Sequence, residues 1–111
     1  MEKKILERTH FDRWSCPTQN AVEAIGDKWT LFIIRELIFG RNEMRFNELL
    51  KALKPISSRT LALKLKKLEA IKIIDRKEIK GKTLNVRYKL TKKGLLLKKP
   101  LTAIAKWYSC C

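Results

Sequence analysis

The sequence predicts a mainly α-helical fold with a small β-hairpin wing (α+β), that is, a winged helix-turn-helix domain that dimerises through its terminal helices. Two observations predict it. Two short helices separated by a turn, over residues 44–55 and 57–70, are followed by a hairpin over residues 73–90. Residues 51–99 hold 17 basic and 3 acidic side chains, whereas residues 1–50 hold 8 of each. A surplus of basic side chains that is concentrated in one part of the chain indicates a surface that binds a polyanion.

Two helices precede the basic region. Residues 16–26 form the first, with Pro17 near its start, where a missing N–H does no harm, and Gly26 at its end. Asp27 is the expected N-cap of the second, over residues 28–40. Because this second helix is apolar on almost every side, we expect it to be central.

The next helix, over residues 44–55, has apolar side chains at helical spacing. Asn47 is its expected N-cap, and Pro55 is expected to stop it. Its apolar positions are Phe46, Leu49, Leu50 and Leu53.

Residues 57–70, SSRTLALKLKKLEA, carry one narrow apolar stripe of Leu61, Leu65 and Leu68. A helix lying on a membrane would show bulky aromatic side chains on a broad apolar face. A coiled coil would need more heptads than the two that fit here. The stripe therefore predicts a helix anchored along one edge with its basic side chains outward, as suits a recognition helix in the major groove.

Strict alternation of apolar and polar residues over 83–90 is the clearest strand signal. With the β-branched stretch over residues 73–79 and a turn at Gly81, it predicts a hairpin with a basic tip. Thr91 is expected to cap a final helix, which Pro100 kinks or divides. We thus expect an N-terminal extension (1–15), the winged domain (16–92) and a dimerisation helix (93–111).

Several classes of protein are disfavoured by composition. With a single histidine and no Gly-rich phosphate loop, the chain offers almost nothing for a metal site or a catalytic constellation, so we expect neither an enzyme nor a cofactor. The first residues resemble no signal peptide, and the longest aliphatic or aromatic run is LFII. Three cysteines without zinc-type spacing fit reduced thiols and a cytoplasmic location, away from membranes.

The chain resembles the HxlR-type transcriptional regulators, which are MarR-like winged-helix dimers. The resemblance covers residues 16–107 and rests on CP at 16–17, IGDKWTLFIIREL at 25–37, RFNELLKAL at 45–53, ISSRTLALKLKKLEA at 56–70 and YKLTKKG at 88–94. It implies a transcriptional regulator that binds double-stranded DNA, and it allows a small-molecule or oxidant effector. By matching position, the implied DNA-contacting residues are Arg45, Ser58, Arg59, Ala62, Leu63 and Lys66.

The chain departs from the family in two places that bear on the operator sequence. Leu63 stands where polar residues such as Gln are common, and the wing is richer in lysine than the usual proline-containing one. We expect the wing to contact phosphates through Lys77, Lys80, Lys82 and Arg87, although exposed lysines also serve solubility alone.

Apolar side chains near both ends exceed what a small core can cover, which predicts a homodimer on a pseudo-palindromic operator. The dimer would repress or activate transcription. The expected interface residues are Phe11, Trp14, Leu97, Leu101, Ile104, Trp107 and Tyr108.

Cys16 lies at a predicted helix start, where helix dipole and free N–H groups favour a thiolate. The resemblance implies a redox-sensing cysteine at this position, and the alternative is a small apolar residue packed in the interface. Cys110 and Cys111 are either resolving partners from the other subunit or an uninvolved end.

Two other functions remain open. A winged helix that binds RNA, or a non-specific architectural one, would show the same attraction to phosphate. The outward positions of residues 57–70 carry no aromatic side chains for stacking on unpaired bases, which favours duplex DNA. A protein-interaction module that uses the terminal helix would show no salt-sensitive affinity for nucleic acid.

Overall fold

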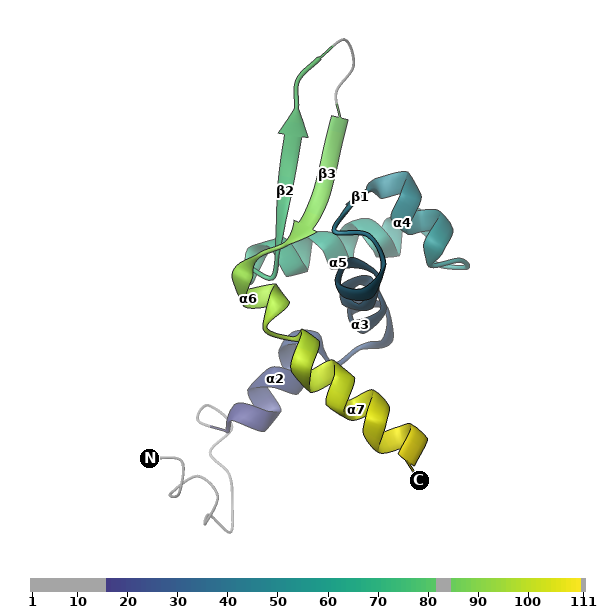
Figure 1. The fold of residues 1–111 in the computed structure, drawn as a ribbon. Coiled ribbons are helices and arrows are strands. Elements are labelled where there is room, and N and C mark those ends of the chain that lie inside the picture. Colours follow the sequence, from purple (N-terminus) through teal and green to yellow (C-terminus); the bar gives the residue numbers. More distant parts are fainter. Residues whose placement is uncertain (1–15, 82–84, 111) are drawn as a thin grey trace.

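The computed structural model describes residues 16–81 and 85–110, and it confirms the predicted class (Figure 1). Phe11, Trp14, Lys82 and Cys111, named above as candidates, lie outside these residues. The elements in order are α2 (Pro17–Ile25), α3 (Lys28–Arg35), η1 (Glu36–Gly40), β1 (Glu43–Arg45), α4 (Phe46–Ala52), α5 (Ser58–Ala70), β2 (Ile74–Ile79), β3 (Asn85–Leu90), α6 (Lys92–Leu95) and α7 (Lys98–Cys110).

Local sequence sets the ends of the first helices as expected. Cys16 is the N-cap of α2 and Pro17 its first residue, while Gly26 closes it. Asp27 caps α3, accepting a hydrogen bond from the Thr30 amide. The predicted helix over 28–40 is present, but its last turn widens into the π-helix η1.

The start of α4 differs from the prediction. Arg45, not Asn47, is the N-cap, because the short strand β1 keeps the chain extended as far as Arg45. The Glu48 carboxylate then accepts a hydrogen bond from the Arg45 amide at 2.8 Å, which satisfies a donor at the helix start. At the other end, α4 stops at Ala52, three residues ahead of Pro55.

The sheet has three strands, although the sequence analysis predicted only two. Its order is β1-β3-β2, and both pairings are antiparallel. Met44, Tyr88 and Leu90 are buried on one face of the sheet. Successive side chains alternate across a strand, so Arg45 and Arg87 belong to the opposite, outer face. The hairpin of β2 and β3 projects from the helical body as the wing (Figure 1).

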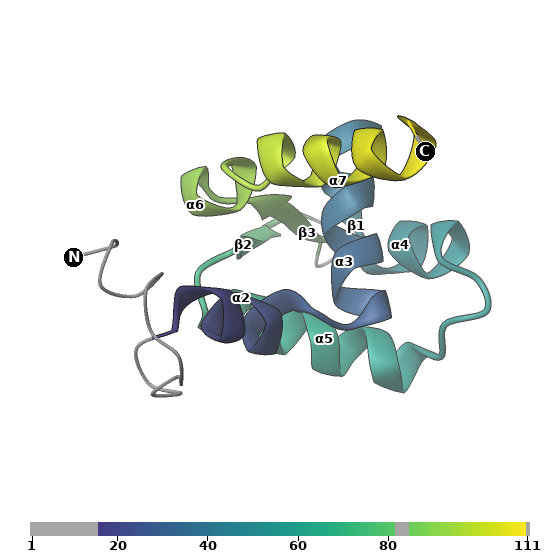
Figure 2. The ribbon, with the colours of Figure 1, turned by 90° about the horizontal axis from the view of Figure 1, so that it is seen from below.

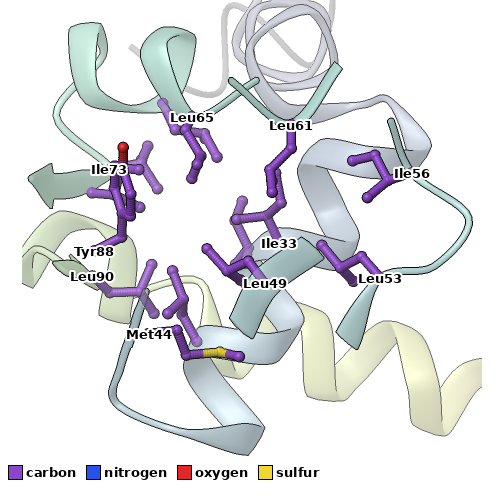
Figure 3. Close-up of a cluster of buried hydrophobic side chains, with 14 residues drawn as sticks. Ile33, Met44, Leu49, Leu53, Ile56, Leu61, Leu65, Ile73, Tyr88 and Leu90 are labelled. Carbon is purple, nitrogen blue, oxygen red and sulfur yellow. The ribbon is translucent and has the colours of Figure 1, made fainter. Parts of the chain in front are cut away.

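The core lies where the central helix α3 meets the sheet and the helices α4 and α5 (Figure 3). Ile33 of α3 is fully buried, and so are Leu61 and Leu68 of the predicted α5 stripe. Figure 2 places α3 between α5 on one side and α7 on the other. This packing fixes α5 along one edge only, as the narrow stripe predicts.

The C-terminal helix is divided into two. Thr91 caps the short α6 and also ties it to the start of the wing, because its hydroxyl donates to Lys72 O at 2.6 Å. The break between the two helices falls at residues 96–97, so that Pro100 lies in the first turn of α7, where proline is tolerated. Within the described residues, no helix is long and apolar enough to cross a membrane.

Candidate nucleic-acid interface

The outward face of α5 presents the side chains that the sequence predicts to read DNA. Ser57 caps the helix by accepting a hydrogen bond from the Thr60 amide at 3.0 Å, which fixes the start of this face. Leu63 is 59% exposed and lies outside the hydrophobic core cluster. The predicted residues Ser58, Arg59, Ala62, Leu63 and Lys66 are all exposed.

The four basic side chains of α5 fall into two pairs, a division that the sequence analysis missed. Lys64 Nζ lies 3.4 Å and Lys67 Nζ 3.9 Å from Asp27 Oδ2, so these two ammonium groups are held against the body of the domain. Arg59 and Lys66 form no ion pair within the described residues. The cations left for an external anion are therefore on the predicted DNA-contacting face.

The outer face of the sheet gathers three of the remaining predicted residues into one row. Arg45 of β1 pairs in register with Arg87 of β3, and Arg87 pairs with Lys77 of β2. Partners directly opposite in an antiparallel sheet lie side by side on the same face, and like charges there repel. We call Arg45, Arg87 and Lys77 the cationic row. An anion such as a phosphate would relieve its repulsion.

Two carboxylates partly offset the charge of this row, Glu43 beside Arg87 and Glu48 beside Arg45. Arg87 Nη1 lies 3.8 Å from Glu43 Oε1, at the limit of an ion pair, and Arg87 Nε is buried without a hydrogen-bond partner in the described structure. A buried donor left unsatisfied is costly, and an incoming ligand can supply the missing acceptor.

Arg45 is exposed, but its backbone is held firmly. Glu48 accepts hydrogen bonds from the Arg45 amide and from Arg41 Nη1 at 3.0 Å. The amide of Arg45, with the nearby Arg41 guanidinium, holds the pKa of Glu48 below its usual value. The ionised carboxylate thus fixes the junction of β1 and α4, from which the Arg45 side chain extends.

The structure places the two sets of predicted residues on separate elements. Arg45, Lys77 and Arg87 lie together on the sheet, and Lys80 is exposed beyond the end of β2. The α5 set lies on a different element, which packs beside β2 at the base of the wing. The cationic row depends on β1, a three-residue strand whose sequence, EMR, carries no strand signal.

Two further predicted features lie away from these surfaces. Ile104, Trp107 and Tyr108 of α7 are 58–79% exposed, whereas Leu97 and Leu101 pack partly against the core. Cys16 is 6% exposed, and its Sγ accepts a hydrogen bond from the Gln19 amide at 3.5 Å.

In the part of the chain that the structure describes, no group of three or more His, Cys, Asp or Glu side chains could hold a metal ion. The features that stand out are instead cationic and apolar surfaces. These suit the binding of a polyanion and of another protein surface.

Comparison with known proteins agrees with this geometry. A family model described as HxlR-like helix-turn-helix matches residues 24–110. The chain is 36% identical, over 82% of its length, to an uncharacterised HTH-type transcriptional regulator of Synechocystis, sll1512, and spans 66% of that protein.

Solved structures resemble the whole fold. A transcriptional regulator of the MarR family from Porphyromonas gingivalis superposes with a TM-score of 0.81 and 30% identity, covering 92% of this chain and 97% of that one. The reduced form of the transcriptional regulator YodB from Bacillus subtilis gives a TM-score of 0.74 and 32% identity, covering 83% and 89%. YodB has also been solved after treatment with diamide.

Proposed function

The chain belongs to the HxlR-like helix-turn-helix family of transcriptional regulators, and from that premise we propose that it binds a pseudo-palindromic operator in duplex DNA as a homodimer. In this proposal α5 enters the major groove, and the wing follows the DNA backbone. Arg59 and Lys66 are the side chains of α5 that approach the base edges or their flanking phosphates.

One observation carries the proposal: two elements that a winged helix turns toward DNA carry clustered basic side chains on their outer faces. On α5 these are Arg59 and Lys66, which form no ion pair within the described residues, and on the sheet they form the cationic row, in which Arg87 makes a weak ion pair with Glu43. Basic side chains that served only solubility would not need to lie in one row, where three like charges repel one another.

The proposed partner in the dimer is a second copy of the chain, docked along α7. Two aromatic side chains, Trp107 at 67% and Tyr108 at 79% exposure, continue the apolar stripe of α7 beyond the part that packs on its own core. A twofold axis there would set two copies of α5 one turn of DNA apart, about 34–36 Å.

The direct test is selection of bound sequences from a random pool of duplex DNA. We expect enrichment of an inverted repeat whose half-sites are spaced by one helical turn. Competition with a structured RNA should leave the complex with the selected duplex intact. Tighter and sequence-dependent binding to the RNA would instead establish an RNA-binding winged helix, and an absence of enrichment would establish an architectural one.

We also propose that Cys16 regulates DNA binding by oxidation. The transcriptional regulator YodB, to which this chain is 32% identical, has been solved both reduced and after treatment with diamide, a thiol oxidant. Cys16 is buried but lies outside the main hydrophobic cluster, at the start of a helix. In the proposed reaction, two thiols from two subunits lose two protons and two electrons to diamide, which becomes the hydrazine, and one S–S bond forms.

Diamide should convert the protein to a covalent dimer on a non-reducing gel and should change its affinity for the selected duplex. Cys16→Ser should abolish both effects. Replacing Cys110 and Cys111 together by Ser identifies the second thiol, because the covalent dimer then disappears only if one of them supplies it. An unchanged response of Cys16→Ser to diamide would leave Cys16 as a packing residue.

A further inference from the structure

Asp27 lies at the corner between α2 and α3, where its carboxylate is fixed by the central helix. Its Oδ1 accepts a hydrogen bond from the Thr30 amide at 2.9 Å, and its Oδ2 accepts one from Thr30 Oγ1 at 2.6 Å. Thr30 itself is fully buried. The position of the carboxylate is therefore set by the core of the domain and not by the surface.

The same carboxylate reaches α5. Lys64 Nζ and Lys67 Nζ lie 3.4 Å and 3.9 Å from Asp27 Oδ2, and the two lysines are three residues apart on one side of α5. Lys67 Nζ also donates to Glu23 O at 3.4 Å, a carbonyl in the last turn of α2, where the helix dipole is negative. One flank of α5 is thus held by charge at the α2–α3 corner.

The carboxylate is ionised at neutral pH. Burial alone would raise the pKa of Asp27, but the hydrogen bonds from Thr30 and the Lys64 ammonium outweigh it, so the pKa lies below the ordinary value. The three side chains are 29–39% exposed. Ion pairs this exposed contribute little to stability.

We propose that Asp27 is a positioning residue that determines DNA specificity: it orients α5 through Lys64 and Lys67 and withholds these two cations from DNA phosphates. The proposal rests on the proposed function, since it requires α5 to bind DNA. It assigns to the α2–α3 corner a role in choosing between the operator and other DNA.

The physical reason is that phosphate attraction is independent of sequence. Each lysine that contacts a phosphate strengthens binding to every duplex alike and steepens its dependence on salt. Base contacts alone discriminate among sequences, and they require the helix to lie in one orientation in the groove. Holding Lys64 and Lys67 inward serves both requirements.

Asp27→Asn tests the proposal, because asparagine is an equally good N-cap that keeps an oxygen for the Thr30 amide, while the negative charge and the acceptor for Thr30 Oγ1 are lost. Two probes are needed: the duplex selected from the random pool and a scrambled duplex of the same composition. We expect affinity for the scrambled duplex to rise several-fold and its salt slope to steepen by about one to two, as one or two lysines are released. The ratio of selected to scrambled affinity should fall.

Glu69→Gln is the matched control. Glu69 is exposed on the same helix, and its replacement changes the net charge by the same amount. If Asp27→Asn and Glu69→Gln behave alike on both probes, Asp27 acts only through net charge and the proposal is wrong. If the wild-type protein shows no salt-dependent binding to either duplex, the proposed function fails first and this inference with it.

A second variant tests the proposal without changing Asp27, the N-cap of α3. The double variant Lys64→Gln, Lys67→Gln should leave affinity for the scrambled duplex within about twofold and lower affinity for the selected one, whereas Lys66→Gln should weaken both. Adding Asp27→Asn to the double variant should have no further effect on the salt slope. A double variant that flattens the slope as much as Lys66→Gln would show that Lys64 and Lys67 contact phosphates themselves, which overturns the proposal.

Discussion

Arg59, Lys77 and Lys80 are all exposed, yet the proposed complex gives Arg59 and the two wing lysines different parts in recognition. A side chain that reaches a base edge discriminates among sequences, whereas one that reaches a phosphate does not. Arg59 lies in the first turn of α5, the part of a recognition helix that enters deepest, while Lys80 lies beyond the end of β2.

We therefore expect Arg59→Ala to cost about 1–3 kcal/mol of binding free energy on the selected duplex and to relax preference at one position of the operator. Lys80→Ala should weaken binding to every duplex equally and flatten the salt slope by about one unit. Titrations of selected and scrambled duplexes over a range of salt concentrations measure both. Equal losses on the two duplexes for Arg59→Ala would make it a phosphate contact.

The lowered pKa of Asp27 predicts a dependence of stability on pH. A carboxyl whose folded pKa lies below its unfolded value, 3.8, stabilises the fold fully above that value and loses this contribution as pH falls through the folded pKa. The free energy of unfolding of the wild type should exceed that of Asp27→Asn by less than about 1 kcal/mol at neutral pH, because the site is partly exposed. Urea unfolding at several pH values between about 2 and about 7 should show that this difference in the free energy of unfolding shrinks only below about pH 4. A difference that persists unchanged to pH 2 (roughly two units below the ordinary value) would contradict an ionic origin.

Residue-level patterns predicted which side chains of α5 are buried, but not which of its lysines are engaged. The 3.6-residue period sorts Leu61 and Leu65 from their neighbours without reference to the rest of the chain. The partner of Lys64 and Lys67 is Asp27, which is distant in sequence and was assigned only the role of a helix cap. Ion pairs between distant elements depend on the packing of those elements, which a local pattern does not contain.

At the level of elements, strong periodic signals predicted α3, α5 and the wing, and two of the misses, β1 and the cap of α4, occur where the signal is short. Strand β1 has three residues and is recognised only through its pairing with β3. Its absence from the prediction led to Asn47 as the cap of α4, because the extended chain that makes Arg45 the cap was not foreseen.

The junction between the core, the wing and α6 depends on a glycine. A Cβ at Gly94 would lie 2.3 Å from Ile73 O and 2.8 Å from Leu90 Cδ2, far inside van der Waals contact. We expect Gly94→Ala to lower the free energy of unfolding by about 1–3 kcal/mol, as overpacking of a buried site does. Gly81→Ala is the control, because a Cβ there meets nothing within 4 Å. Urea unfolding of the two variants measures the contrast, and equal stability of both would mean that α6 can shift freely.

At the level of the whole molecule, the C-terminal part of α7 extends beyond the rest of the domain (Figure 1). Only the first half of its apolar stripe is buried: Leu101 packs partly against the core, whereas Tyr108 is exposed. This is the pattern expected of a helix whose second half is covered by another subunit.

Ile104→Glu should therefore yield a folded monomer, because Ile104 is 58% exposed within one chain. The control is Lys106→Glu, which lies on the opposite side of α7 from the stripe. Sedimentation at micromolar concentration should show a dimer for the wild type and for Lys106→Glu, and a monomer for Ile104→Glu. Because Ile104→Glu is expected to prevent dimerisation, its affinity for the inverted repeat should fall. The thermal unfolding temperature of a dilute sample should change little. A dimeric Ile104→Glu would place the interface elsewhere.

The order β1-β3-β2 has a consequence for how the protein can be divided. Strand β1 belongs to the first half of the chain, but its hydrogen-bonding partner, β3, follows both α4 and α5 in the sequence. A fragment that ended after α5 would leave the backbone of β1 unpaired and Met44 without the sheet that covers it. Loop closure over this span comes late in folding, since its entropic cost must be met before the contacts form. The helix pair that is expected to read DNA is thus not an autonomous module, and it can be transplanted to another protein only together with its wing.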